Sequence, residues 1–123
     1  MAKQIRVLVV DDDTDVRETI KEMLAPLGLA VSVATGARQA LEMCEDGCPY
    51  DVVLTDVVMP EIGGTRLAEM LRQQHPTLPI VLMTGRDSAL DRVLDEGVVP
   101  LVKPFTAAQL WRVVEELTKG VHR

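Results

Sequence analysis

The chain has 123 residues, 47% hydrophobic and 26% charged, and its 13 Lys and Arg against 19 Asp and Glu give a formal net charge of −6. This length suits a single domain over residues 1–123, with a core over about 5–117, and excludes a second full domain. The acidic balance argues against direct nucleic-acid or membrane binding, and with no apolar stretch near about 20 residues and no signal peptide we expect a cytoplasmic protein.

The first predicted element is a strand over 5–10, because IRVLVV is almost continuously apolar, as in strands buried on both faces of a sheet. The strand ends abruptly in three carboxylates, at Asp11, Asp12 and Asp13. Apolar residues then recur at helical spacing and predict a helix over about 15–25, with Asp13 or Thr14 as its cap and Gly28 closing it.

Two further strand and helix units follow. The short alternating segment 30–34 predicts an edge strand, and the next helix has one apolar face, made by Ala37, Ala40, Leu41 and Cys44. After a break at 47–49, a buried strand is expected over 51–55, and it too ends in a carboxylate, Asp56. The segment 59–64 has loop composition, and the third helix then presents Leu67, Met70 and Leu71.

The last two units complete the chain. A fourth strand over 80–83 ends at Thr84 and Gly85, and a short charged helix is expected over 88–96. A fifth strand over 98–102 ends at Lys103. The C-terminal helix begins near Thr106, and its apolar face is formed by Leu110, Val113, Val114 and Leu117.

Five strands alternating with five helices predict an α/β fold with an open, doubly wound parallel sheet. The favoured strand order is the flavodoxin-like 2-1-3-4-5. A closed eight-stranded α/β barrel would need about twice this length. In open sheets of this kind, ligands bind beyond the carboxyl ends of the strands.

Polar side chains stand at four of these strand ends: Asp11 and Asp12, Asp56, Thr84, and Lys103. Neighbouring carboxylates repel one another unless a cation lies among them. Oxygen ligands with room for water suit Mg²⁺, and Mn²⁺ would also fit.

A metal beside one further carboxylate, a lysine and a hydroxyl has the parts needed for phosphoryl transfer. Asp56 is the candidate nucleophile, because it stands alone at its strand end in the middle of the sheet. Lys103 would pair with one phosphoryl oxygen, and Thr84 would donate a hydrogen bond to another.

Three other patterns in the sequence have simpler interpretations. The acids from Asp11 to Glu22 imitate a calcium-binding loop, but its sixth position is Val16 rather than Gly and a strand precedes it. Cys44 and Cys48 match neither a disulfide framework nor a usual zinc spacing, which favours two reduced thiols. The two histidines are expected at the surface without positioned partners, at His75 and His122.

The stretches VLVVDDD, YDVVLTDVVMPEIGG, IVLMTGR and LVKPF occur in this order. In them the chain resembles the receiver domain of bacterial two-component response regulators, over about residues 5–117. The resemblance implies that Asp56 is the phosphoacceptor, and that Asp11, Asp12, Asp56 and the backbone carbonyl of Val58 bind Mg²⁺. It also implies that Thr84 is the switch hydroxyl, that Lys103 pairs with the phosphate, and that the peptide bond between Lys103 and Pro104 is cis.

One position departs from the family pattern. Receivers usually carry Tyr or Phe three residues before the lysine, where this chain has Pro100, and the segment 97–103 is one residue shorter than usual. Similar versions with proline resemble receivers of hybrid histidine kinases, whose output is phosphotransfer. Val58 and Arg86 flank the expected path of attacking water, and since Val58 is apolar and Arg86 can shield the phosphate, we expect slow dephosphorylation.

The leading hypothesis is a Mg²⁺-dependent phosphoacceptor switch, which catalyses only its own phosphorylation and dephosphorylation. Its partners would be a sensor histidine kinase and a histidine phosphotransfer protein or an output domain, and the chain would be a monomer or weak dimer. The alternatives are the receiver portion of a hybrid kinase, a relay shuttle, a Mg²⁺-dependent phosphohydrolase with an aspartyl intermediate, and a pseudo-receiver interaction module. Without the aromatic ring, Val99, Pro100 and Leu101 would carry the conformational change.

Overall fold

The computed structural model describes residues 4–85 and 97–119. Within them the strands are β1 (Arg6–Val10), β2 (Ala30–Ala34), β3 (Val52–Asp56), β4 (Ile80–Thr84) and β5 (Val98–Val102). The helices are α1 (Thr14–Leu24), the short 3₁₀ helix η1 (Ala25–Leu27), α2 (Ala37–Met43), α3 (Gly64–Gln74) and α4 (Ala107–Leu117).

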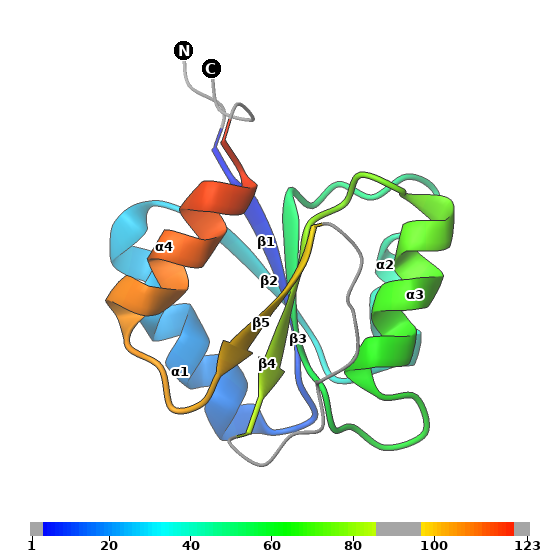
Figure 1. The fold of residues 1–123 in the computed structure, drawn as a ribbon, viewed down its shortest axis with the longest axis horizontal. Coiled ribbons are helices and arrows are strands. Elements are labelled where there is room, and N and C mark those ends of the chain that lie inside the picture. The colour runs from blue at the N-terminus through cyan, green and yellow to red at the C-terminus, as the bar shows by residue number, and fades with distance from the viewer. Residues whose placement is uncertain (1–3, 86–96, 120–123) are drawn as a thin grey trace.

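The five strands form one parallel sheet in the order β2-β1-β3-β4-β5 (Figure 1). This confirms the doubly wound, flavodoxin-like architecture. The described part of the chain contains four of the five expected α-helices, and the one expected over 88–96 lies outside it. The first helix begins and ends one residue earlier than expected.

Among the residues that the structure describes, two α-helices lie on each face of the sheet. In Figure 1, α1 and α4 lie on one side and α2 and α3 on the other. Alternate residues of β1 point to opposite faces. Val7 and Val9 pack with the core under α1 and α4, whereas Leu8 and Val10 pack with the core under α2 and α3. Because all four side chains are fully buried, β1 has no polar face and its sequence is continuously apolar.

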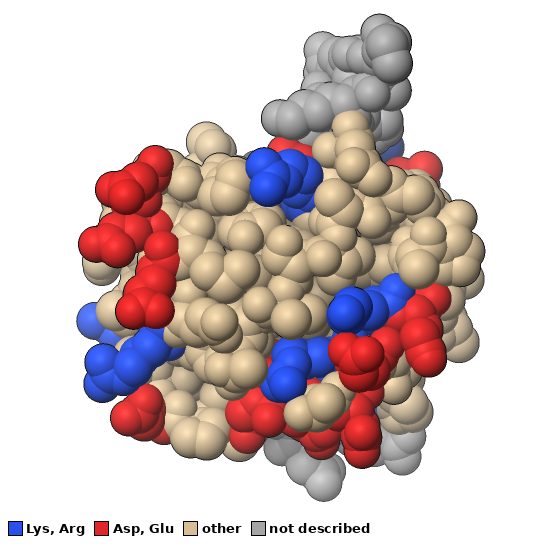
Figure 2. Space-filling view, turned by 180° about the vertical axis from the view of Figure 1, so that it is seen from behind, with Lys and Arg blue, Asp and Glu red and all other residues tan. Residues whose placement is uncertain are grey.

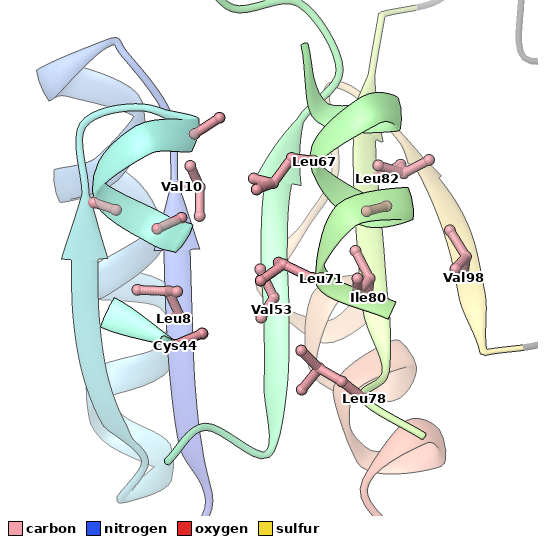
Figure 3. Close-up of a cluster of buried hydrophobic side chains, with 14 of the residues drawn as sticks. Leu8, Val10, Cys44, Val53, Leu67, Leu71, Leu78, Ile80, Leu82 and Val98 are labelled. Atoms are coloured by element: carbon pink, nitrogen blue, oxygen red, sulfur yellow. The ribbon is translucent and has the colours of Figure 1, made fainter. Parts of the chain in front are cut away.

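The core under α2 and α3 joins side chains from all five strands and from both helices. Figure 3 shows Leu67 and Leu71 of α3 above the sheet residues Val53 and Ile80, while Cys44 at the end of α2 lies beside Leu8. This packing holds α3 against the middle of the sheet. It thereby fixes the loop between β3 and α3, which follows Asp56.

The ends of the elements agree with local sequence. Asp13 caps α1 by accepting a 2.8 Å hydrogen bond from the backbone N–H of Asp15. Thr106 and Gln109 form a reciprocal capping box at the start of α4. Pro100 lies in β5, an edge strand, where a missing N–H is tolerated.

None of the helices within residues 4–85 and 97–119 has the length and apolar character needed to cross a membrane.

Candidate functional site

Three carboxylates meet at the carboxyl ends of β1 and β3. The register of the sheet explains why: Val10 pairs with Thr55, so the next residues, Asp11 and Asp56, are neighbours. One oxygen each from Asp11, Asp12 and Asp56 lies within 4.8 Å of the others. The strand ends point to the lower edge in Figure 1, and Figure 2 shows acidic and basic side chains gathered along the same edge.

Asp11 is the most buried of the three acids, with 1% of its surface exposed. Its Oδ1 accepts a 2.9 Å hydrogen bond from the backbone N–H of Asp13, while its Oδ2 has no hydrogen-bond partner. Burial raises the pKa of Asp11 above its ordinary value of 3.8, and the charges of Asp56 and Asp12 act in the same direction. A buried, unsatisfied carboxylate oxygen facing two further acids fits a divalent cation with oxygen ligands.

Lys103 supplies the positive charge of the site. Its Nζ lies 3.3 Å from Asp56 Oδ1 and 3.9 Å from Asp11 Oδ2. Its backbone N–H donates a 2.7 Å hydrogen bond to the carbonyl of Thr84, which fixes the end of β5 beside the end of β4. The peptide bond to Pro104 is cis, as the resemblance implies. Lys103 therefore reaches the acids from an edge strand by extending past the end of β4.

Thr84 ends β4 and is 3% exposed. In the register of β3 and β4, Asp56 pairs with Met83, so Thr84 lies one residue beyond Asp56. Its hydroxyl donates a 3.2 Å hydrogen bond to the carbonyl of Gly85. The hydroxyl is thus at the right strand end, but it is engaged locally and would have to rotate to reach a group on Asp56.

The loop after Asp56 is held by close backbone contacts. The N–H of Gly64 donates a 2.8 Å hydrogen bond to the carbonyl of Val57, and a Cβ on Gly64 would collide with the Asp56 carbonyl. Glycine therefore allows α3 to begin directly against the end of β3. Val58 is 78% exposed in this loop, beside Asp56. Arg86, the other expected tuning residue, lies outside the described residues.

Sequence reasoning missed a second support of the site, Arg17. Its Nη1 donates a 2.6 Å hydrogen bond to the backbone carbonyl of Asp11, and its Nη2 lies 3.0 Å from Thr14 Oγ1. These contacts anchor the loop between β1 and α1, which carries the acidic pair. No periodic pattern in the sequence could reveal them, because an arginine on an exposed helix face usually points to solvent.

The structure also decides between readings of the neighbouring acids and the histidines. Residues from Thr14 onward form α1, so the resemblance to a calcium loop is accidental. The expectation that His75 has no positioned partner is wrong, since its Nε2 lies 3.0 Å from the backbone carbonyl of Cys44. His122 lies outside the described residues. Cys44 and Cys48 are both free thiols, as expected.

Comparison with known families adds a direct match. The model of the response regulator receiver domain matches residues 7–115. Response regulator MprA of Mycolicibacterium vanbaalenii is 40% identical over 109 residues, which cover 86% of this chain and 47% of the relative. The transcriptional regulatory protein CpxR of Escherichia coli is 36% identical over 120 residues, or 95% of this chain and 50% of the relative. The chain thus spans about half the length of these curated relatives.

Solved structures show the same architecture. A response regulator receiver domain protein from Clostridium thermocellum superposes with a TM-score of 0.85 at 27% identity, covering 93% of this chain and 94% of that one. A receiver protein from Sinorhizobium medicae gives a TM-score of 0.83 at 29% identity, with coverages of 96% and 97%.

Proposed function

The chain belongs to the response regulator receiver domain family of two-component signalling, and we propose that it is a Mg²⁺-dependent phosphoacceptor switch that receives a phosphoryl group on Asp56. The observation that carries this proposal is the environment of the Asp56 carboxylate. It is 17% exposed, pairs with Lys103 at 3.3 Å, and shares its strand end with Asp11 and Asp12. A nucleophile, a counter-charge and a set of metal ligands therefore meet at one accessible point.

In the transfer, a carboxylate oxygen of Asp56 attacks the phosphorus of the donor in line with the leaving group. An O–P bond to Asp56 forms, while the bond to the donor nitrogen or oxygen breaks and its electrons stay with the donor. Lys103 Nζ, already beside Asp56, pairs with an oxygen of the transferred group. The hydroxyl of Thr84 exchanges the Gly85 carbonyl for another phosphoryl oxygen.

Asp11, Asp12, Asp56 and the backbone carbonyl of Val58 are the residues that would hold Mg²⁺, or Mn²⁺ in its place. The bound ion would neutralise charge on the transferring phosphoryl group. The buried Oδ2 of Asp11, which lacks a hydrogen-bond partner, supports this assignment.

The phosphodonor under this proposal is a sensor histidine kinase, and the location is the cytoplasm, where ATP supplies such kinases. The chain would catalyse only its own phosphorylation and dephosphorylation, as a monomer or weak dimer. Its signal would pass to an output domain or to a histidine phosphotransfer protein, and the second route includes the receiver of a hybrid kinase. Pro100 favours the second route, because the position lacks the aromatic ring of the usual switch.

The proposal is tested by intact mass after incubation with Mg²⁺ and acetyl phosphate. We expect one phosphoryl adduct that is stable in acid and lost in base, absent from Asp56→Asn and present in Asp46→Asn. The second variant makes the same charge change at an exposed position in the turn before β3. No adduct together with no Mg²⁺ binding would leave an interaction module, and repeated turnover of a small phosphate ester would indicate a phosphohydrolase.

A further inference from the structure

The only two cysteines of the chain lie side by side at the end of α2. Their Sγ atoms are 3.0 Å apart, so one thiol donates a hydrogen bond to the other. This separation is only about 1 Å longer than the bond of a disulfide. Formation of a bond between the two sulfurs thus needs little movement of the chain.

Local structure brings the two thiols together. Cys44 is the C-terminal cap of α2, and its N–H bonds back to the carbonyl of Leu41 at 3.2 Å. The chain then reverses through Gly47, whose φ of 101° lies in the left-handed region that favours glycine. This turn returns Cys48 to the last turn of the helix.

The two thiols differ in access to solvent. Cys44 is fully buried and packs beside Leu8 in the core under α2 and α3 (Figure 3). Cys48 is partly exposed and packs at the margin of the same core. A reagent from solvent can therefore reach Cys48 but not Cys44. Once Cys48 has reacted, its modified sulfur lies within reach of Cys44.

The surroundings also polarise the pair. The hydrogen bond from Cys44 lowers the pKa of Cys48 to about 6, against the opposing effect of burial. The charge of His75 acts in the same direction as that bond, and the charge of Asp51 opposes it. The pKa of Cys44 is raised by the same hydrogen bond and by burial. Cys48 thus carries the nucleophilic thiolate and Cys44 keeps its proton.

We propose that Cys44 and Cys48 form a redox-active dithiol in which a hydroperoxide oxidises Cys48 and Cys44 then closes an intramolecular disulfide. In the first step, the Cys48 thiolate attacks the peroxide oxygen, the O–O bond breaks, and a sulfenic acid and a hydroxide or alkoxide result. In the second step, Cys44 Sγ attacks Cys48 Sγ, its thiol proton leaves, and the hydroxyl of the sulfenic acid departs as water. Two thiols lose two electrons and two protons, and the peroxide is reduced to water, or to an alcohol and water.

This site is separate from the phosphoacceptor region. Cys44 and Cys48 precede β3, whereas Asp56 is its last residue, so the two sites lie at opposite ends of the strands. Because His75, at the end of α3, contacts the carbonyl of Cys44, the disulfide would also fasten the turn after α2, which this contact links to the end of α3. Oxidation would therefore alter the face of the domain formed by α2 and α3, and it would not modify the residues around Asp56.

The test uses the reduced full chain, treated with hydrogen peroxide, quenched with N-ethylmaleimide and measured by intact mass. We expect a monomer lighter by two hydrogen atoms that takes up no maleimide, and dithiothreitol should restore two reactive thiols. In Cys44→Ser, Cys48 should stop at the sulfenic acid and be trapped by dimedone. In Cys48→Ser, the buried Cys44 should resist the same dose.

Three results would overturn the proposal. In the first, a peroxide dose that oxidises Cys48 in Cys44→Ser leaves both thiols of the wild type open to alkylation. In the second, the wild type forms only disulfide-linked dimers. In the third, Cys48→Ser is oxidised as fast as the wild type. Cys44→Ala provides a second variant if serine in the core prevents folding, and far-ultraviolet circular dichroism verifies the fold of each protein.

Discussion

Lys103 and Asp56, 47 residues apart in the sequence, are joined by a 3.3 Å contact between Nζ and Oδ1 across the end of β4. The same ammonium lies 3.9 Å from Asp11 Oδ2, beyond hydrogen-bond distance. One lysine thus offsets the charge of a group of carboxylates and satisfies only one of them fully. This imbalance is the basis of the first two predictions.

Lys103→Gln should slow phosphorylation of Asp56 by acetyl phosphate about 10²-fold at saturating Mg²⁺, because it removes the ammonium that the proposed function pairs with a phosphoryl oxygen. The initial rate is measured by intact mass. Lys119→Gln removes an exposed lysine that pairs with Glu116, and it should keep the wild-type rate. Equal rates for the two variants would show that Lys103 takes no part in the transfer.

Asp11→Asn should stabilise the metal-free protein at neutral pH and raise its Tm by a few degrees. Since burial raises the pKa of Asp11, the folded state binds its proton more tightly than the unfolded state does. The free energy of unfolding of the wild type therefore falls as pH rises from the ordinary value of 3.8 through the raised value, and the penalty stays complete above it. Thermal melts between acid and neutral pH measure this slope.

The control for this prediction is Asp46→Asn, which makes the same charge change at an exposed acid and should leave the Tm of the metal-free protein unchanged. Mg²⁺ should stabilise the wild type by about 2.7 kcal/mol at 100 times its Kd, and it should stabilise Asp11→Asn much less. A variant that melts below the wild type without metal would contradict the argument from burial.

Gly64→Ala should destabilise the fold by about 2 kcal/mol or more, because the new Cβ would overlap the backbone carbonyl of Asp56. Gly36→Ala is the matched control. Gly36 precedes α2 in extended backbone, and a Cβ there would meet nothing within 4 Å. Urea denaturation compares the two variants. Equal midpoints would mean that the loop after β3 shifts to accommodate the new Cβ without a measurable loss in the free energy of unfolding.

The strands and the acidic strand ends could be predicted from sequence because the information is local or periodic. The apolar run of β1 reflects burial on both faces, and the acids at the carboxyl ends of β1 and β3 follow from where those runs stop. In contrast, Arg17 on the Asp11 carbonyl and His75 on the Cys44 carbonyl are contacts with backbone atoms. They depend on how packed elements meet, which no spacing in one sequence encodes.

The contact between the two cysteines could not be predicted from the sequence either. Its spacing of four residues resembles no common redox or zinc motif, and the 3.0 Å approach of the two sulfurs depends on the reversal at Gly47. The composition of segment 59–64 indicates only a loop at Gly64, whereas in the structure Gly64 adjoins the backbone of Asp56. Sequence therefore located the strand ends, and the structure supplied the contacts that support them.

Alkylation of Cys48 by iodoacetamide should increase with pH around a midpoint near 6, because the hydrogen bond from Cys44 lowers the pKa of Cys48 to about 6. Cys44→Ala removes that donor and should move the midpoint upward, toward the value of about 8.5 for an ordinary thiol. Rates are followed by mass spectrometry from pH 5 to 9. A midpoint that stays the same in Cys44→Ala would assign the shift to His75 instead.

Val58→Asn should shorten the lifetime of the phosphorylated protein about tenfold, which corresponds to about 1.4 kcal/mol in the barrier to hydrolysis. Val58 is 78% exposed and lies two residues after Asp56, and under the proposed function its side chain would border the approach of water to the phosphoryl group. Valine cannot orient that water, whereas the amide of asparagine can accept and donate hydrogen bonds to it. Val58→Leu is the apolar control and should decay like the wild type. Decay is followed by intact mass after removal of acetyl phosphate, and equal lifetimes for the asparagine and leucine variants would exclude control of the lifetime at this position.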